Sequence, residues 1–258
     1  MKNVQVGLQV YTVSDELRNN YVHALEKIAA IGYSVIEIGG FGPFSIAEWK
    51  KTLKDLNLSV VANHIPFEML EESFNHIAEF NLGIGNRNIV CPYLREEVRQ
   101  NADGYKRVAE SLNRIGEKCK SQGMALHYHN HSFEFMKFDG KCGLDILFDE
   151  TEPQLVMFEL DTYWVTHGGA DPAEYFKKFA GRCRLVHLKD MTADEERTFA
   201  EVGEGMIDFT NLFRIAGETE IECFIVEQDI CKRPSLESAK ISFENIKKIA
   251  QNSGIIAK

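Results

Sequence analysis

Four apolar segments in the second half of the chain end in residues that bind divalent metals well. Each has the composition of a buried strand, and successive segments are separated by about the length of one strand and one helix. The segments are 125–131 (ALHYHNH), 155–161 (LVMFELD), 184–190 (RLVHLKD) and 224–229 (FIVEQD). If the strands are parallel, their carboxyl ends meet, and two imidazoles and two carboxylates converge. The predicted metal ligands are His129, Asp161, His187 and Glu227.

This ligand set favours a particular chemistry. Imidazole and carboxylate ligands together suit Mn²⁺, Co²⁺, Zn²⁺, Fe²⁺ or, less well, Mg²⁺. One such ion would accept two vicinal oxygens of a substrate, polarise a carbonyl and stabilise a developing enediolate. A lone histidine in a strand is more often a hydrogen-bonded core residue, but four strands place ligand-type residues near the same end. The pattern therefore predicts one divalent metal ion and proton abstraction next to a carbonyl.

The segments that must position these residues alternate along the whole chain. Eight apolar runs read as buried parallel strands, and amphipathic helical segments separate them. The runs are 4–10, 34–39, 58–65, 88–93, 124–130, 155–161, 184–190 and 223–228. The clearest helical segments are 15–32, 45–56, 101–123, 171–180 and 235–251, and weaker ones are 67–80, 141–150 and 208–217.

Eight strand–helix units in 258 residues predict a single-domain (β/α)₈ TIM barrel over residues 1–258. A doubly wound open sheet is the alternative, although no GxGxxG motif follows the first strand. In such a barrel, catalytic residues lie at the carboxyl ends of the strands.

Composition excludes several other classes of protein. The formal net charge of −10 argues against nucleic-acid binding. No apolar run reaches the ~18–20 residues needed to cross a membrane, and the first residues lack the pattern of a signal peptide. We therefore expect a cytoplasmic protein with no membrane partner. The six cysteines form no CxxC motif, so we expect free buried thiols.

Several of these segments resemble the xylose-isomerase-like TIM-barrel superfamily, which includes sugar isomerases and epimerases, inosose dehydratases and endonuclease IV. The opening segments 8–17 and 32–42 resemble its sugar phosphate isomerase/epimerase subgroup. The other matching segments are 128–135 (YHNHSFEF), 158–164 (FELDTYW), 186–190 (VHLKD), 203–209 (GEGMIDF) and 225–229 (IVEQD). The resemblance implies one divalent metal held by strands five to eight, a small-molecule sugar substrate, and a homo-oligomer, since these barrels often dimerise or tetramerise.

The resemblance maps three family ligands onto Asp161, His187 and Glu227. The fourth family ligand is usually a glutamate, whereas His129 stands at that position here. Glu134, a few residues later, is the competing candidate.

This departure bears on the reaction. Ketose epimerases of the superfamily use two metal-bound glutamates as acid and base, and only Glu227 matches one of them. Other groups must then move protons, and the candidates are Lys189, His131, Glu134 and Glu159. The predicted function is a sugar isomerase or epimerase. The alternatives are a dehydratase or lyase acting on an inosose or a 3-keto-glycoside, and a non-catalytic sugar-binding barrel.

Other residues are predicted to line the substrate pocket: Gln9, Tyr11, Glu37, His64 and Trp164. Endonuclease IV has a histidine ligand where this chain has Trp164, so that nuclease is disfavoured, and Trp164 reads as an apolar wall or a platform for a sugar ring. Phe41 and Phe44 flank a loop that either covers the pocket or packs on the core. The loop 203–209 resembles a phosphate-binding turn, but its acidic neighbours favour an unphosphorylated sugar.

Overall fold

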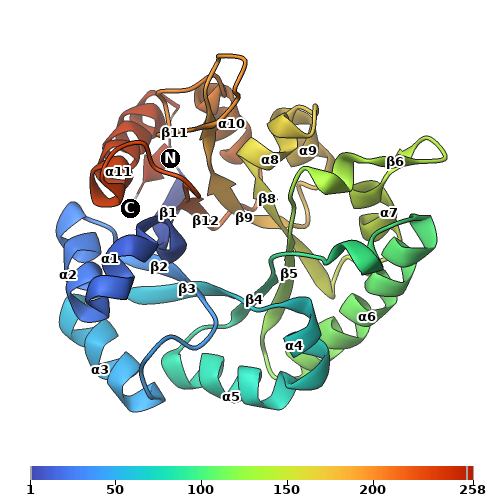
Figure 1. Cartoon of the computed structure of the whole chain (residues 1–258), viewed down its shortest axis with the longest axis horizontal. Helices are drawn as coiled ribbons and strands as arrows, with labels where there is room; N and C mark the ends of the chain where they lie inside the picture. The colour runs from blue at the N-terminus through green and yellow to red at the C-terminus, as the bar shows by residue number, and fades with distance from the viewer. Residues whose placement is uncertain (1, 254, 258) are drawn as a thin grey trace.

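The buried apolar runs form a closed ring of parallel strands in the computed structural model, which describes residues 2–253 and 255–257 (Figure 1). The order is β12-β9-β8-β5-β4-β3-β2-β1, and β1 pairs in parallel with β12 to close the sheet. The predicted (β/α)₈ barrel is confirmed. Its strands are β1 (Lys2–Gln9), β2 (Val35–Gly39), β3 (Ser59–His64), β4 (Asn88–Cys91), β5 (Ala125–His129), β8 (Val156–Asp161), β9 (Cys183–Leu188) and β12 (Cys223–Val226).

Helices surround this ring and cover its outer face (Figure 1). Their apolar sides and the outward side chains of the strands form the main hydrophobic core. The outer helices are α2 (Tyr21–Ile31), α3 (Ile46–Leu56), α5 (Phe74–Ile84), α6 (Ala102–Ser121), α7 (Gly143–Asp149), α9 (Pro172–Lys178), α10 (Phe209–Ala216) and α11 (Ser235–Asn252).

Side-chain caps set the ends of several helices. Ser45 and Glu48 form a capping box at the start of α3, and Asp171 caps α9. The single helix predicted over 15–32 is instead two helices, α1 (Ser14–Asn19) and α2. The break falls at Asn20, whose side chain accepts a hydrogen bond from the backbone N–H of His23 and so starts a new helix.

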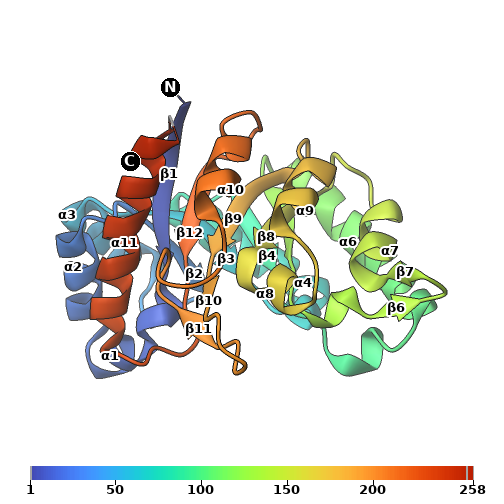
Figure 2. The same ribbon diagram turned by 90° about the horizontal axis from the view of Figure 1, so that it is seen from above.

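Short additional elements follow the carboxyl ends of the strands and build one face of the barrel, at the bottom of Figure 2. They are η1 (Val10–Val13), α1, α4 (Phe67–Glu72), η2 (Glu96–Val98), η3 (Phe133–Phe135), the β6–β7 hairpin (Lys137–Phe138, Lys141–Cys142), α8 (Thr162–His167) and the β10–β11 hairpin (Asp190–Met191, Phe199–Ala200). A last strand, β13 (Ile255–Ala257), pairs with β1 at the opposite end.

The barrel interior is apolar near the amino ends of the strands and contains charged residues further along its axis. Near the amino ends of the strands it is an apolar cluster that includes Val35, Ala62 and Ile225. Two residues further along β2 comes Glu37, and β8 carries Glu159 at a similar level. The strand register shifts next to both glutamates, between Ile36 and Glu37 and between Phe158 and Glu159. Such irregularities re-aim side chains and are common beside active sites.

Two predictions from composition can be compared with the structure. All six cysteines are free; five are buried and Cys231 is half-buried. Within the described part of the chain, no helix is both long enough and apolar enough to cross a membrane.

Candidate active site

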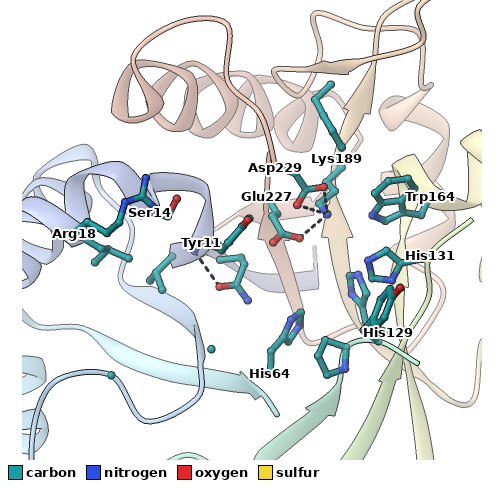
Figure 3. A pocket seen from close by; sticks show the side chains of 18 of the residues that line it. Tyr11, Ser14, Arg18, His64, His129, His131, Trp164, Lys189, Glu227 and Asp229 are labelled. Atoms are coloured by element: carbon teal, nitrogen blue, oxygen red, sulfur yellow. Dashed lines mark hydrogen bonds and ion pairs between the residues drawn. The ribbon is translucent and has the colours of Figure 1, made fainter. Parts of the chain in front are cut away.

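A cavity of about 860 Å³ opens at the carboxyl ends of the strands (Figure 3). Eight of the predicted site residues line it: Gln9, Tyr11, His64, His129, His131, Trp164, Lys189 and Glu227. Asp161 and His187 lie directly beneath its floor, where they contact Lys189 and Glu227. Glu37 and Glu134 do not line the cavity, and the structure gives them other roles.

The four predicted ligands converge. His129, Asp161, His187 and Glu227 each offer one ligand atom, and all four atoms lie within 4.8 Å of one another. His187 Nδ1 lies 2.8 Å from Glu227 Oε2, and His129 Nε2 lies 3.7 Å from Asp161 Oδ2. This spacing leaves room for an ion bound by all four groups.

Asp161 is both a helix cap and a candidate metal ligand. One carboxylate oxygen accepts a hydrogen bond from the backbone N–H of Trp164 and caps α8, at 2.8 Å. The other oxygen, Oδ2, is buried and accepts no hydrogen bond from any residue that the structure describes, although the ammonium of Lys189 lies 3.2 Å away. The cap fixes the carboxylate and directs Oδ2 toward the centre of the ligand set.

Each histidine of the set has a buried carboxylate behind it. His187 Nε2 lies 2.5 Å from Glu37 Oε2, and His129 Nδ1 lies 2.9 Å from Glu159 Oε1. When these ring nitrogens carry the proton, the nitrogens that face the ligand set are free to bind an ion. Metal-binding histidines generally have such a partner, which fixes both tautomer and ring orientation. The donor set therefore fits a divalent metal ion.

His64 joins the two buried carboxylates. Its Nε2 lies 2.9 Å from Glu159 and 3.2 Å from Glu37, and Gln9 also donates a hydrogen bond to Glu37, at 2.9 Å. Glu37 was predicted to contact substrate, but it is fully buried behind His187. Its hydrogen bonds make it a group that positions other side chains.

A second set of residues satisfies the same distance test. His64, His129, Glu159 and His187 also bring four ligand atoms within 4.8 Å of one another. Of these residues, only His64 and His129 line the cavity. The set of His129, Asp161, His187 and Glu227 has Glu227 on the cavity lining and the Asp161 oxygen that accepts no hydrogen bond from a described residue, so it offers better access for substrate oxygens.

The buried carboxylates of the site change the pKa values of the histidines beside them. Although burial opposes the charged form, Glu159 and Glu37 hold the pKa of His187 well above its usual range. Against the same effect, Glu37 and Glu159 raise the pKa of His64 to about 10. Burial lowers the pKa of His129 well below its usual value, so this imidazole is neutral, as a ligand must be, whereas His187 would have to release a proton when an ion binds.

Lys189 is held as an ammonium ion. Its Nζ lies 2.7 Å from Glu227, 3.2 Å from Asp161 and 3.1 Å from Asp229. Burial opposes the charge, but these carboxylates raise the pKa of Lys189 above its usual range. These salt bridges hold Lys189 in its protonated form, which can donate a hydrogen bond to a substrate oxygen. Against burial, Lys189 and His187 hold the pKa of Glu227 well below its usual range, so Glu227 is ionised.

The structure does not bring Glu134 into the site. Its carboxylate is buried and accepts hydrogen bonds from the Tyr128 hydroxyl at 2.6 Å and from the His131 backbone N–H at 2.8 Å. Tyr128 lies on the outward face of β5, one residue before His129, so Glu134 fastens the following loop to the outside of the barrel. His129 remains the residue of strand five in the ligand set.

The cavity wall beside the ligand set is aromatic. The His131 ring stacks on Phe133 with centroids 5.4 Å apart and lies 5.2 Å from the ring of Trp164. Burial lowers the pKa of His131 to about 3, and its Nδ1 has no hydrogen-bond partner among the described residues. Trp164 forms a wall, as predicted, with the Lys189 ammonium 5.7 Å from its ring centroid. Phe41 and Phe44 lie outside the cavity lining and pack on the core.

Backbone amides of the loop 203–209 bind an acceptor within the protein. The carboxylate of Asp190 accepts hydrogen bonds from the backbone N–H groups of Gly203, Gly205 and Ile207, at 2.9–3.1 Å. Gly205 allows this close approach, because a Cβ there would lie 2.4 Å from Asp190 Oδ1. The carboxylate of Asp190 therefore occupies the position that a bound phosphate would need.

Sequence reasoning missed part of the cavity wall. Ser14, Leu17, Arg18 and Tyr21 line it from α1 and the start of α2. No motif marked them, because Leu17, Arg18 and Tyr21 lie in the segment 15–32, which was predicted as an amphipathic helix, and Ser14 immediately precedes it.

Comparisons with known proteins agree with this geometry. Residues 25–249 match the family described as xylose isomerase-like TIM barrel. An inosose dehydratase of Clostridium beijerinckii is 26% identical over 250 residues, covering 82% of this chain and 83% of that protein. A sugar phosphate isomerase/epimerase structure from Parabacteroides distasonis superimposes with a TM-score of 0.84 at 27% identity, covering 98% of this chain and 95% of that one. A structure of an L-ribulose 3-epimerase, with a TM-score of 0.72 at 18% identity, shares the fold.

Proposed function

Because the chain belongs to the xylose isomerase-like TIM barrel family, we propose that it is a divalent-metal-dependent enzyme that abstracts a proton next to the carbonyl of a keto-sugar. The observation that best supports this proposal is that His129 is paired with the buried carboxylate of Glu159, and His187 with that of Glu37. This pairing turns one nitrogen of each ring toward the ligand set. A sugar isomerase is the first candidate.

The proposed metal ligands are His129, Asp161, His187 and Glu227. A bound divalent ion would supply Lewis-acid polarisation of the substrate carbonyl. Glu227 is ionised and lines the cavity, so it is placed to accept the proton. Lys189 contacts Glu227 and is placed to donate a proton to a substrate oxygen. Trp164 and His131 shield this end of the cavity from water.

The supply of glutamates on the cavity wall limits the reaction. Glu227 lines the cavity, whereas Glu37, Glu134 and Glu159 do not. Epimerisation by two opposed glutamates therefore lacks its second group. Return of the proton by Glu227 to the neighbouring carbon would give isomerisation instead.

Dehydration is the second candidate function. The curated relatives that match 82–92% of this chain include several inosose dehydratases. Loss of a β-hydroxyl from an inosose, or of a sugar from a 3-keto-glycoside, begins with the same proton abstraction. The Lys189 ammonium would then protonate the departing oxygen.

Proton NMR in D₂O tests both candidates. The protein is incubated with Mn²⁺ and a panel of ketoses, inososes and 3-keto-glycosides. Deuterium at one carbon identifies the proton removed, and loss of a hydroxyl or glycoside separates elimination from isomerisation. Glu227→Gln should abolish exchange, and Glu134→Gln is the matched control outside the cavity. If protein purified without chelator contains no divalent metal and catalyses no exchange, a non-catalytic sugar-binding barrel is the better account.

A further inference from the structure

The cavity extends away from the predicted metal ligands to a second end. Its wall there is formed by Ser14, Leu17 and Arg18 of α1 and by Tyr21 of α2. Figure 3 shows Ser14 and Arg18 on the opposite side of the cavity from Lys189 and Trp164. A volume of about 860 Å³ lies in the upper part of the range for sites that enclose a sizeable small molecule. The ligand set and this second end can therefore contact different parts of one substrate.

Three hydrogen-bonding groups at the second end are unused. The Ser14 hydroxyl, the Arg18 guanidinium and the Tyr21 hydroxyl make no hydrogen bond or ion pair with any residue that the structure describes. Arg18 is exposed and has no carboxylate partner in the described part of the chain, although the chain has 39 acidic and only 29 basic residues. Ser14 and Arg18 stand four residues apart on one helix and so share a face.

Tyr21 is rigidly placed beside them. Phe44 and Trp49 pack edge-on against its ring, with centroids 5.2 and 5.7 Å away. Its hydroxyl lies next to Gly42, where a Cβ would stand 3.4 Å from the oxygen. The missing side chain at Gly42 keeps the space around the hydroxyl open.

The two ends of the cavity differ in charge. Glu227 and Asp229 line one end, with Asp161 beneath it, whereas the second end carries an unpaired cation. A guanidinium together with hydroxyl donors matches the oxygens of a phosphate or carboxylate. We propose that Arg18, Ser14 and Tyr21 bind an anionic group of the substrate, so that the enzyme acts on a sugar with a phosphate or carboxylate remote from its carbonyl. This inference rests on the proposed function for the orientation of the sugar, and it revises the unphosphorylated substrate expected from the loop 203–209.

Calorimetric titration of the full chain tests the proposal with three probes that differ in charge: D-fructose, D-fructose 6-phosphate and D-glucuronate. We expect at least one of the charged probes to bind more tightly than fructose, and the phosphate and carboxylate arms identify the preferred anion. Arg18→Met should weaken binding of that probe about ten- to hundredfold, with smaller losses for Ser14→Ala and Tyr21→Phe. Binding of fructose should be unchanged. Arg107→Met, on the outer surface of α6, is the matched control for the loss of one exposed charge.

Three results would overturn the proposal: no preference for either charged probe over fructose, equal losses in Arg18→Met and Arg107→Met, or equal losses for charged and neutral probes in Arg18→Met. Binding is measured without turnover, so the outcome is separate from that of the NMR experiment. A charged probe held through Arg18 without any proton exchange would support the anion site and count against the proposed reaction.

Discussion

The carboxylate behind His187 provides the sharpest test of the proposed metal site. Glu37 is fully buried, and its Oε2 lies 2.5 Å from His187 Nε2 and 2.9 Å from Gln9 Nε2. Glu37→Gln preserves the volume and one accepting oxygen but removes the negative charge. The imidazole then loses the partner that fixes its proton on the side away from the ion. We expect weaker metal binding in a variant that still folds.

The size of the effect follows from general values for such partners. Their removal typically lowers metal affinity 10- to 100-fold, which corresponds to about 1.4–2.7 kcal/mol. Mn²⁺ present at 100 times the wild-type Kd stabilises the folded state by about 2.7 kcal/mol. A 100-fold weaker variant would keep only about 0.4 kcal/mol at the same concentration. For a chain of this length the metal-induced rise in Tm would then fall by roughly 5–9 °C.

Two measurements check this expectation. Competition with a chelator gives the Mn²⁺ affinity, and thermal unfolding with and without Mn²⁺ gives the change in Tm. Glu134→Gln is the control, because it also neutralises a buried carboxyl group but lies outside the cavity. An unchanged Mn²⁺ affinity in Glu37→Gln, or an equal loss in the control, would refute the assignment of His187 as a ligand oriented by Glu37.

Three further changes test other parts of the structure. Lys189→Met removes an ammonium that contacts two proposed metal ligands, so Mn²⁺ affinity should rise while turnover falls; weaker Mn²⁺ binding in a chelator competition would contradict this. Burial raises the pKa of Glu134 from 4.5 to about 7, so the folded state binds more protons than the unfolded chain between these values. The free energy of unfolding of the wild type should therefore fall relative to Glu134→Gln, by up to about 3 kcal/mol, as pH rises from 4.5 to 7 in urea titrations; parallel pH profiles would count against it. Gly205→Ala places a Cβ 2.4 Å from Asp190 Oδ1 and should lower the free energy of unfolding by about 1–3 kcal/mol, and an unchanged urea midpoint would show that the turn relaxes freely.

The barrel and the convergence of the four candidate ligands were predictable because both depend on strong periodic patterns. Buried parallel strands are apolar on both faces, so eight such runs separated by helices define the fold. The period of two within a strand then fixes which residues face inward. That rule placed His129, Asp161, His187 and Glu227 on the inner side without knowledge of the loops.

The rest of the site depends on loops and hydrogen bonds that have no period. Glu134 was a candidate ligand from its spacing alone, but the 3₁₀ turn η3 and the hydroxyl of Tyr128 turn it outward. Glu37 was predicted to line the substrate pocket, yet it contacts His187, which lies 150 residues away in the sequence. The break at Asn20, which separates Arg18 from Tyr21, depends on one side-chain cap.

The burial of Glu37 and Glu159 helps to decide between an enzyme and a barrel that only binds sugars. Neither carboxylate reaches the cavity, so neither can hydrogen-bond a ligand. Interiors of such barrels are ordinarily filled by Val, Ile and Leu, and apolar replacements of buried ionic groups are often neutral or stabilising. A binding barrel needs polar groups only on its cavity wall. Both carboxylates contact His64 and His187, Glu159 also contacts His129, and Glu37 also accepts a hydrogen bond from Gln9. Orientation of these imidazoles explains why charged groups are buried at this level of the barrel, and a bound metal ion would require that orientation.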